Sequence, residues 1–404
     1  MVGARGSGIL VTTRSQIVSS IMGTVLSHFL QGLSDVDCWS LFEQRVFLQG
    51  NSNAHPNLAV IGKEIVKKCK GLLLAVKTLP GLLFSKLDEE EWIAILKSDI
   101  WDLPEERNGV LPALRLSYHH LPSHLKQCYA FCSIFRKGHK FKEDVLVPLW
   151  MAEGFVQPKG NKQMEDVGSE YLADLVSRSF FQYEYNNWDN QKEYTMHDLI
   201  HDLAQSISGV ECLRMEEGKS CAVVDKVRHV SYDWFSMEAV HFEAFYNLES
   251  LRTLLLLSIL KNCTKHVPRE LFINLRRIGV LDLSGADIKE LPVSVENLIH
   301  LRYLDLSLTQ IERLPGSTTS LYNLQTLKLI DCSQLVELPS DLSNLVNLRH
   351  LPLGKEIGHG INELKDMINL RGEICISLLE NVVNVDEVKE AELKSKRKLQ
   401  KLEL

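Results

Sequence analysis

Two heptapeptides in the second half of the chain decide its fold, I-G-V-L-D-L-S at 278–284 and L-R-Y-L-D-L-S at 301–307. Two related heptapeptides follow, L-Q-T-L-K-L-I at 324–330 and L-R-H-L-P-L-G at 348–354. The four copies begin 23, 23 and 24 residues apart. Alternate leucines in each copy are expected to point inward from a short strand. One copy cannot bury these leucines alone, so the pattern predicts that several copies stack.

Steps of this length fall within the range of about 20–29 residues that leucine-rich repeats use. The pair Leu-Pro recurs where the chain is expected to leave each strand and turn along the outer side, at 291–292, 314–315 and 338–339. Strand patterns at 251–257 and 370–376 extend the array, and 386–401 is expected to form a helix before a last strand. The sequence therefore predicts an α/β solenoid of leucine-rich repeats over 216–404.

Residues 31–215 are expected to be mainly helical. The spacing of apolar residues predicts helices at 61–69, 111–121, 123–135, 144–155 and 165–178. The second and third of these separate at Pro122, because proline does not continue a helix, and Ser123 is the expected N-cap of the third.

After residue 178 the apolar period changes from helical to alternating. Segments 179–185 and 192–196 are predicted strands that the turn-rich N-N-W-D-N joins, and a helix follows from His197. Helices with a β-hairpin wing describe a winged-helix domain. Such domains often bind DNA, but the helix from His197 carries Asp198 and Asp202 rather than basic residues, and fold alone does not establish function.

The composition is that of a soluble globular chain long enough for two or three domains, with 404 residues, 45% of them hydrophobic, and a net charge of −7. This charge gives no support for a nucleic-acid or membrane-surface protein. The basic cluster at 394–398 is interleaved with glutamate and indicates a solvated helix face. No stretch approaches the roughly 20 apolar residues of a membrane span. Nine cysteines without a C-x-x-C pair favour reduced thiols and a cytoplasmic location.

The motif M-H-D-L-I-H-D at 196–202 places His197 and His201 four residues apart, as in zinc-binding helices. A zinc hydrolase would also need a third ligand and a general base, and Asp198 is shorter than the usual glutamate. Three interpretations remain open: zinc binding, a structural or capping role, and a role tied to a nucleotide. The apolar residues on one side of this helix disfavour zinc catalysis.

Cys128 and Cys132 are also four residues apart, with histidines at 119, 120 and 124. A zinc cluster is conceivable, but the aromatic and aliphatic neighbours favour buried thiols. The sequence lacks G-x-S-x-G and the phosphate loop G-x-x-x-x-G-K-[ST]. It therefore predicts no catalytic residue, no metal ligand and no enzyme.

Six blocks of sequence occur in the order typical of one family, and the chain resembles plant nucleotide-binding leucine-rich-repeat disease-resistance proteins of the coiled-coil subclass. The blocks are G-S-G-I-L-V-T-T-R-S (6–15), L-S-D-V-D-C-W-S-L-F (33–42), C-K-G-L-L-L-A-V-K-T-L (69–79), C-Y-A-F-C-S-I-F (128–135), L-W-M-A-E-G-F (149–155) and M-H-D-L-I-H-D-L-A (196–204). The resemblance implies a remnant of an α/β P-loop nucleotide-binding domain, a helical domain, a winged-helix domain and the repeats, over 1–30, 31–105, 106–215 and 216–404.

In that family the nucleotide-binding module switches between ADP and ATP. The resemblance implies that Arg14, at the end of an expected buried strand 9–13, senses the terminal phosphate of ATP, which suits a guanidinium. It implies that His197 contacts the β-phosphate of ADP and that Asp198 helps to fix this geometry. The residue against the adenine is normally proline, and here it is Leu73. Arg136 also replaces a usual proline.

Both ends of the chain suggest truncation, because it opens on a strand pattern and stops within a repeat. Without a phosphate loop, we expect weak or absent nucleotide binding and no hydrolysis. The expected function is that of a plant immune receptor or a truncated product of one. The alternative is an ATPase in its own right, if a phosphate loop precedes the chain.

The expected partner is a pathogen effector or a guarded host protein, which would meet the strand face of the repeats. Within the chain, the winged-helix domain and the repeats are expected to pack together, and activation could bring self-association. Binding to nucleic acid is not expected.

Overall fold

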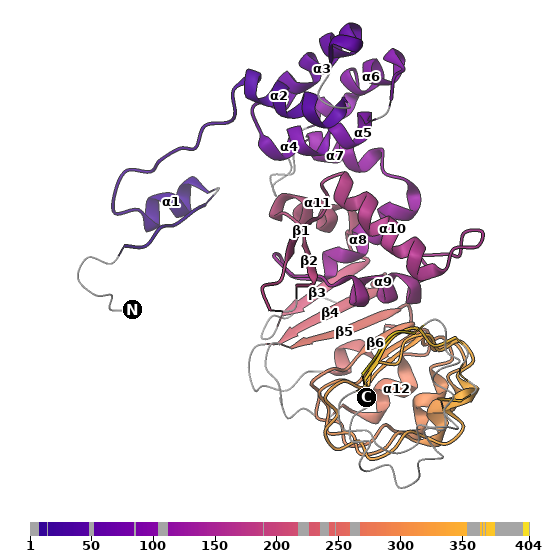
Figure 1. The fold of residues 1–404 in the computed structure, drawn as a ribbon. Coiled ribbons are helices and arrows are strands. Elements are labelled where there is room, and N and C mark those ends of the chain that lie inside the picture. Colours follow the sequence, from indigo (N-terminus) through magenta and orange to yellow (C-terminus); the bar gives the residue numbers. More distant parts are fainter. Residues whose placement is uncertain are drawn as a thin grey trace. The chain divides into compact units, whose positions relative to one another are not determined.

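The structure is a computed structural model. It describes residues 8–13, 15–47, 52–84, 86–103, 112–188, 190–216, 226–234, 242–246, 248–258, 267–353, 364–365, 367, 369–375 and 399–403. The chain forms two compact units, residues 1–101 and 102–404 (Figure 1).

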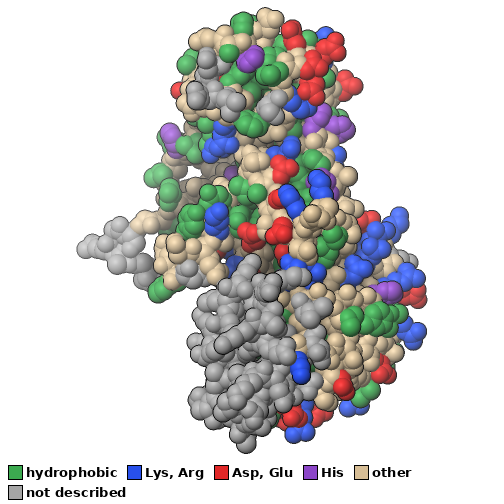
Figure 2. Space-filling model, turned by 45° about the vertical axis from the view of Figure 1, so that its right-hand side comes forward, with side chains coloured by type: hydrophobic (Ala, Val, Ile, Leu, Met, Phe, Trp, Pro, Cys, Tyr) green, Lys and Arg blue, Asp and Glu red, His purple; other side chains and the backbone are tan. Residues whose placement is uncertain are grey.

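The first unit is helical. Its helices are α1 (Gln16–Met22), α2 (Asp35–Val46), α3 (Pro56–Lys68), α4 (Leu73–Thr78), α5 (Pro80–Leu83) and α6 (Glu89–Leu96), with 3₁₀ helices at Ser52–Ala54 and Asp99–Asp102. Helix α2 begins where the Ser34 hydroxyl accepts a hydrogen bond from the amide of Asp37. Phe42, Ile65 and Trp92 are buried at the centre. Acidic side chains gather on this unit in Figure 2, and the first turn of α6 carries three glutamates.

The prediction of a buried strand at 9–13 is wrong. Residues 8–13 have no regular secondary structure, and the side chains of Ile9 and Leu10 are 82% and 93% exposed. A strand is stable only when a neighbour satisfies its backbone hydrogen bonds, and no described residue pairs with this segment. An apolar run by itself does not provide that neighbour.

The second unit begins with the elements of a winged helix. These are α7 (Pro112–His119), α8 (Ser123–Phe131), α9 (Glu143–Ala152), α10 (Met164–Ser177), β1 (Gln182–Tyr185), β2 (Lys192–Thr195) and α11 (Asp198–Ser208), with a 3₁₀ helix at Cys132–Ile134. Strands β1 and β2 are antiparallel, which confirms the predicted wing. One detail was wrong: the N-cap of α8 is Pro122, so Ser123 is the first helical residue and its side chain makes no capping bond.

The repeats form one parallel sheet. Its strands follow chain order: β3 (Cys212–Glu216), β4 (His229–Trp234), β5 (Thr253–Ser258), β6 (Val280–Asp282), β7 (Tyr303–Asp305) and β8 (Thr326–Lys328). Bridges from Thr326 to His350 and from His350 to Arg371 continue the ladder. The first three copies each contain one strand with unshifted register and the fourth contributes bridges, which confirms the predicted solenoid. Strands β3 and β4 lack the repeat signature and were missed, so the sheet begins before the expected boundary at 216.

The chain leaves the strands and turns along the outer side of the solenoid at the Leu-Pro pairs, as predicted. A short 3₁₀ helix follows each pair, namely Val293–Asn297, Gly316–Ser320 and Leu342–Asn344. The 3₁₀ helix Phe242–Phe245 and the helix α12 (Arg269–Asn274) come earlier in the chain. Two further parallel strands are β9 (Gly372–Cys375) and β10 (Leu399–Glu403). The expected helix at 386–401 is therefore wrong over its last residues, and 386–398 lie outside the described residues.

Candidate functional site

His197 is the N-cap of α11. Its backbone is extended, with φ −63° and ψ 145°, and its Nδ1 accepts a hydrogen bond of 3.2 Å from the amide of Leu199. The side chains of His197 and Asp198 are both exposed. An accepting Nδ1 leaves the ring proton on Nε2 in the neutral tautomer, so the exposed ring of His197 keeps one N–H donor.

His201, in contrast, belongs to the core, where 2% of the residue is exposed. Its Nε2 lies 2.6 Å from the carbonyl oxygen of Phe135. Burial lowers the pKa of His201 although this hydrogen bond acts in the opposite direction, so the ring stays neutral. Asp202 beside it is buried against Lys137.

The two histidines therefore cannot act as a zinc pair. One ring caps the helix at the surface, and the other is buried with Nε2 already bonded. Within the part of the chain that the structure describes, no three His, Cys, Asp or Glu side chains form a group that could hold a metal ion. Cys128 and Cys132 are buried, and burial raises the pKa of both thiols, which confirms the prediction of buried thiols.

Leu73 is the first residue of α4 in the first unit, and 44% of it is exposed. Just before it, Gly71 has φ +74° and its carbonyl accepts a hydrogen bond of 2.8 Å from the amide of Leu33. A Cβ on Gly71 would lie 2.7 Å from the carbonyl oxygen of Leu33, so only glycine fits. Proline favours the first helical position, and leucine can stand there without strain.

Of the four predicted site residues, His197 and Asp198 are neighbours at the start of α11 in the second unit. Leu73 belongs to the other compact unit, and Arg14 lies outside the described residues.

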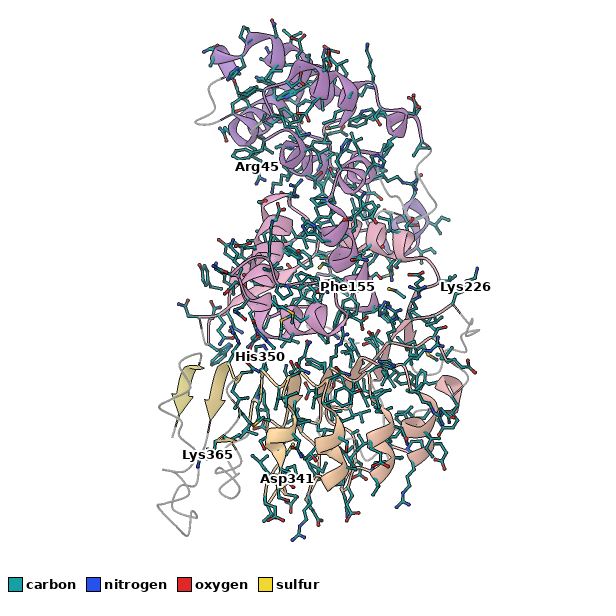
Figure 3. All side chains as sticks on the ribbon, turned by 90° about the vertical axis from the view of Figure 1, so that its right-hand side faces the viewer. Arg45, Phe155, Lys226, Asp341, His350 and Lys365 are labelled. Atoms are coloured by element: carbon teal, nitrogen blue, oxygen red, sulfur yellow. The ribbon has the colours of Figure 1, made fainter. Side chains whose placement is uncertain are left out.

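A second cluster joins the winged-helix domain to the repeats, and sequence reasoning did not find its residues. Glu165, in the first turn of α10, forms a bidentate ion pair with Arg349, with Nε at 2.6 Å and Nη2 at 2.8 Å. His350 Nε2 at 3.3 Å and Arg371 Nη1 at 3.7 Å approach the same carboxylate. Burial alone would raise the pKa of Glu165, but His350 and Arg349 hold it well below its usual range. His350 stands where the strands meet the winged-helix domain (Figure 3).

A third contact lies where α9 ends against the first repeats. The hydroxyl of Thr253 donates to a carboxylate oxygen of Glu153 and lies 3.0 Å from Nδ1 of His229. His229 Nδ1 is also 3.7 Å from Glu153 Oε2. Burial raises the pKa of Glu153 to about 7 and lowers the pKa of His229 to about 3. Nearby, Arg302 donates to the carbonyl of Ala152 at 3.3 Å.

We call two sets of contacts the domain seam. They are the contacts of Glu165 with the repeats and the contacts of Ala152 and Glu153 with the repeats. They confirm the predicted packing between the winged-helix domain and the repeats. Aligning the repeats could have indicated one side of the seam, because Arg302, Arg349 and Arg371 occupy equivalent positions just before their strands. The acidic partners carry no such signal, because they are far away in the sequence.

The seam also covers part of the strand face. Residues in register across β4 to β8 are all buried, although they point away from the leucine core, namely His229, Thr253, Val280, Tyr303 and Thr326. Helix α9 packs against β7 on this side. This row of the strand face is therefore covered by other parts of the same chain.

A winged-helix domain packed on leucine-rich repeats defines the class of the protein. Residues 134–204 match the family described as Disease resistance protein Winged helix domain, and residues 293–404 match Leucine-rich repeat region. The disease resistance protein RGA2 of Solanum bulbocastanum is 40% identical over 100% of this chain and 41% of its own length. RPP13-like protein 1 of Arabidopsis thaliana is 44% identical over 74% of this chain and 29% of its own length.

The chain belongs to the plant disease-resistance proteins that carry a winged-helix domain and leucine-rich repeats. It spans between 29% and 41% of the length of the two relatives named above. Every helix in the described part of the chain is too short or too polar to cross a bilayer.

Proposed function

We propose that this chain is the switch-and-recognition part of a plant immune receptor, in which the state of an adenine nucleotide at α11 is passed to the repeats. The observation that supports this proposal is that α11 and β4 are hydrogen-bonded to the carbonyl groups of two adjacent residues. His201 of α11 is bonded to the carbonyl of Phe135, and Ser231 of β4 donates to the carbonyl of Ile134. A movement of α11 would therefore act directly on the first strands of the solenoid.

His197 supports a role toward a phosphate. The ring is exposed and its Nδ1 is used by the cap, so Nε2 is the nitrogen left for a ligand at the start of α11, where the helix dipole also favours an anion. In the proposed receptor, this donor contacts the β-phosphate of ADP and Asp198 fixes the local geometry. Arg14 would sense ATP and Leu73 would lie against the adenine, as the family resemblance implies. Adenine nucleotide would supply the signal, and these residues would supply its contacts.

One donor and one apolar side chain do not replace a phosphate loop. We therefore propose that the isolated chain binds ADP or ATP weakly or not at all, does not hydrolyse ATP, and is not an enzyme by itself. The test is a titration of the purified chain with labelled ATP. We expect no saturation in the micromolar range, and micromolar affinity would refute this part of the proposal.

The receptor role is tested in a full-length relative of the family that carries the same blocks. We expect His197→Ala or Asp198→Val, at the equivalent positions, to loosen the ADP-held state and to raise signalling in leaves. Ser231→Ala should weaken the step from α11 to the repeats and lower the signal of the His197→Ala variant. Signalling equal to wild type in the histidine and aspartate variants would contradict the phosphate role.

In the same proposal the protein acts in the cytoplasm and its repeats recognise a pathogen effector or a guarded host protein. The closed state is held by the domain seam, and its release would allow self-association.

A further inference from the structure

One flank of the solenoid is held rigid and leaves a column of apolar side chains exposed. We call it the apolar flank, and it consists of Ile299, Tyr322 and Val346, which follow equivalent leucines in consecutive repeats. The three residues are 44%, 51% and 61% exposed. Because they occupy the same position in adjacent rungs, their side chains form one continuous strip.

The residues beside the strip fix its geometry. The amide of Asn323 donates to the carbonyl of Ile299 at 2.7 Å, and the amide of Asn347 donates to the carbonyl of Tyr322 at 2.7 Å. Asn369 repeats this contact with Val346 at 3.1 Å. These hydrogen bonds join an asparagine side chain of each rung to a backbone carbonyl of the previous rung. They do not involve the apolar side chains, so the fold does not explain why Ile, Tyr and Val stand there.

The preceding rungs give the same flank a basic end. Arg276 occupies the position equivalent to Ile299, and Arg277 and His300 stand beside the strip. All three are exposed, as is Arg252 one rung earlier. Exposed acidic residues of these rungs include Glu249, which precedes Arg276 at the equivalent position, and Glu296, and the basic residues named above outnumber these two at this end. Figure 2 shows hydrophobic side chains on the solenoid beside a histidine and basic side chains. The flank is therefore bipartite, with positive charge at one end and apolar surface at the other.

We propose that the apolar flank and its basic end dock an amphipathic helix of a partner protein, with acidic side chains at one end of the helix and an apolar stripe along the rest. The charges are complementary, because the carboxylates would meet Arg276 and Arg277 and the stripe would cover the three apolar residues. Part of the strand face is already occupied by the winged-helix domain, whereas the flank is open. The inference rests on the recognition role proposed above and specifies its surface and its ligand.

The repeat distance favours a helix over an extended peptide. Neighbouring rungs of a parallel sheet are about 4.8 Å apart. A helix lying across the rungs presents one side chain per turn at about 5.4 Å, so over three rungs the mismatch reaches only about 1.2 Å. An extended strand presents side chains on the same face about 6.6 Å apart, so its spacing no longer matches the rungs over the same span.

The probe is a fluorescent helical peptide of about 16 residues, with glutamates on the first turn and leucines once per turn on the same face. Its affinity for the purified full chain is measured by anisotropy. We expect binding that weakens at least tenfold in the double variant Tyr322→Ser, Val346→Ser, because burial of either side chain is worth that much. We expect Arg276→Gln, Arg277→Gln to weaken binding several-fold and to reduce its salt dependence.

The matched control is Val293→Ser, which removes an apolar side chain that is 64% exposed but outside the flank. This variant should bind the peptide like wild type, and all variants should keep the wild-type circular dichroism and melting temperature. A peptide with glutamine in place of glutamate should bind wild type and the arginine variant equally. No binding of the parent peptide, or equal binding by the flank variant and the control, would overturn the proposal. Neither result touches the nucleotide role, because the assay contains no nucleotide.

Discussion

Two arginine side chains, Arg349 and Arg371, and the ring of His350 converge on the carboxylate of Glu165, and 21% of its side chain is exposed. Removing it takes from Arg349 and Arg371 the carboxylate that both approach. We expect Glu165→Ala to lower the free energy of unfolding by about 2–4 kcal/mol, as for other broken ion pairs in partly buried sites. Urea unfolding at neutral pH measures this difference.

The same group predicts a pH dependence. Because the folded state holds the pKa of Glu165 below its usual value, its contribution is complete above the usual pKa and is lost as pH falls below it. The stability difference between wild type and Glu165→Gln should therefore shrink between about pH 4.5 and pH 2. A difference that stays constant over this range would contradict the charge-based role.

His197 makes a cap that can be tested in the isolated chain. His197→Ala removes the acceptor for the amide of Leu199, and a lost N-cap typically costs about 1 kcal/mol. His197→Asn supplies another accepting group and should recover most of this loss. Hydrogen exchange of the first turn of α11 measures the effect. If asparagine protected the turn no better than alanine, the capping role would have to be abandoned.

At the scale of elements, the contact between α9, β4 and β5 contains two titratable groups whose pKa values shift in opposite directions. Glu153 has its pKa raised from 4.5 to about 7, and His229 has its pKa lowered from 6.5 to about 3. The charged and titratable groups around them are Arg228, Arg252, Arg302 and Cys212. Between pH 4.5 and 6.5 the packed state holds one proton on Glu153, and the separated state holds one on His229. The two contributions cancel, so this contact should be insensitive to pH.

Single substitutions should expose each half of this balance. In Glu153→Gln only His229 titrates, and stability should fall as pH drops below 6.5, by up to about 1.4 kcal/mol per unit. In His229→Gln only Glu153 titrates, and stability should fall as pH rises from 4.5 to 7 with a similar slope. Thermal unfolding of both variants between pH 5 and 7.5 measures the slopes. Slopes of the same sign would exclude this account.

On the scale of the whole molecule, the domain seam should make residues 112–375 unfold together. The winged-helix domain and the solenoid share buried polar contacts between residues as far apart as Glu165 and Arg349. We expect one calorimetric transition for this part of wild type and two in Glu165→Ala, because the domains then lose the ion pair between α10 and Arg349. The isolated repeats serve as the reference for the second transition. A single unchanged transition in the variant would show that apolar packing alone couples the domains.

The sequence by itself determined the solenoid and the winged helix, because both depend on local period. A repeat of 23 or 24 residues places each strand beside the previous copy, and the change to alternation at β1 and β2 marks the wing. It also indicated where the thiols of Cys128 and Cys132 would be buried, because their neighbours are apolar.

Only the tertiary structure decided the roles of individual polar residues. His197 and His201 have the same spacing as a metal pair, yet the chain around Phe135 buries one ring and leaves the other at the surface. Residues 9–13 have a strand pattern, but no described neighbour pairs with them. Glu165 meets Arg349 across 184 positions. The role of each of these polar residues depends on which distant groups lie beside it in a low-dielectric site. Local periodicity in the sequence does not contain this information.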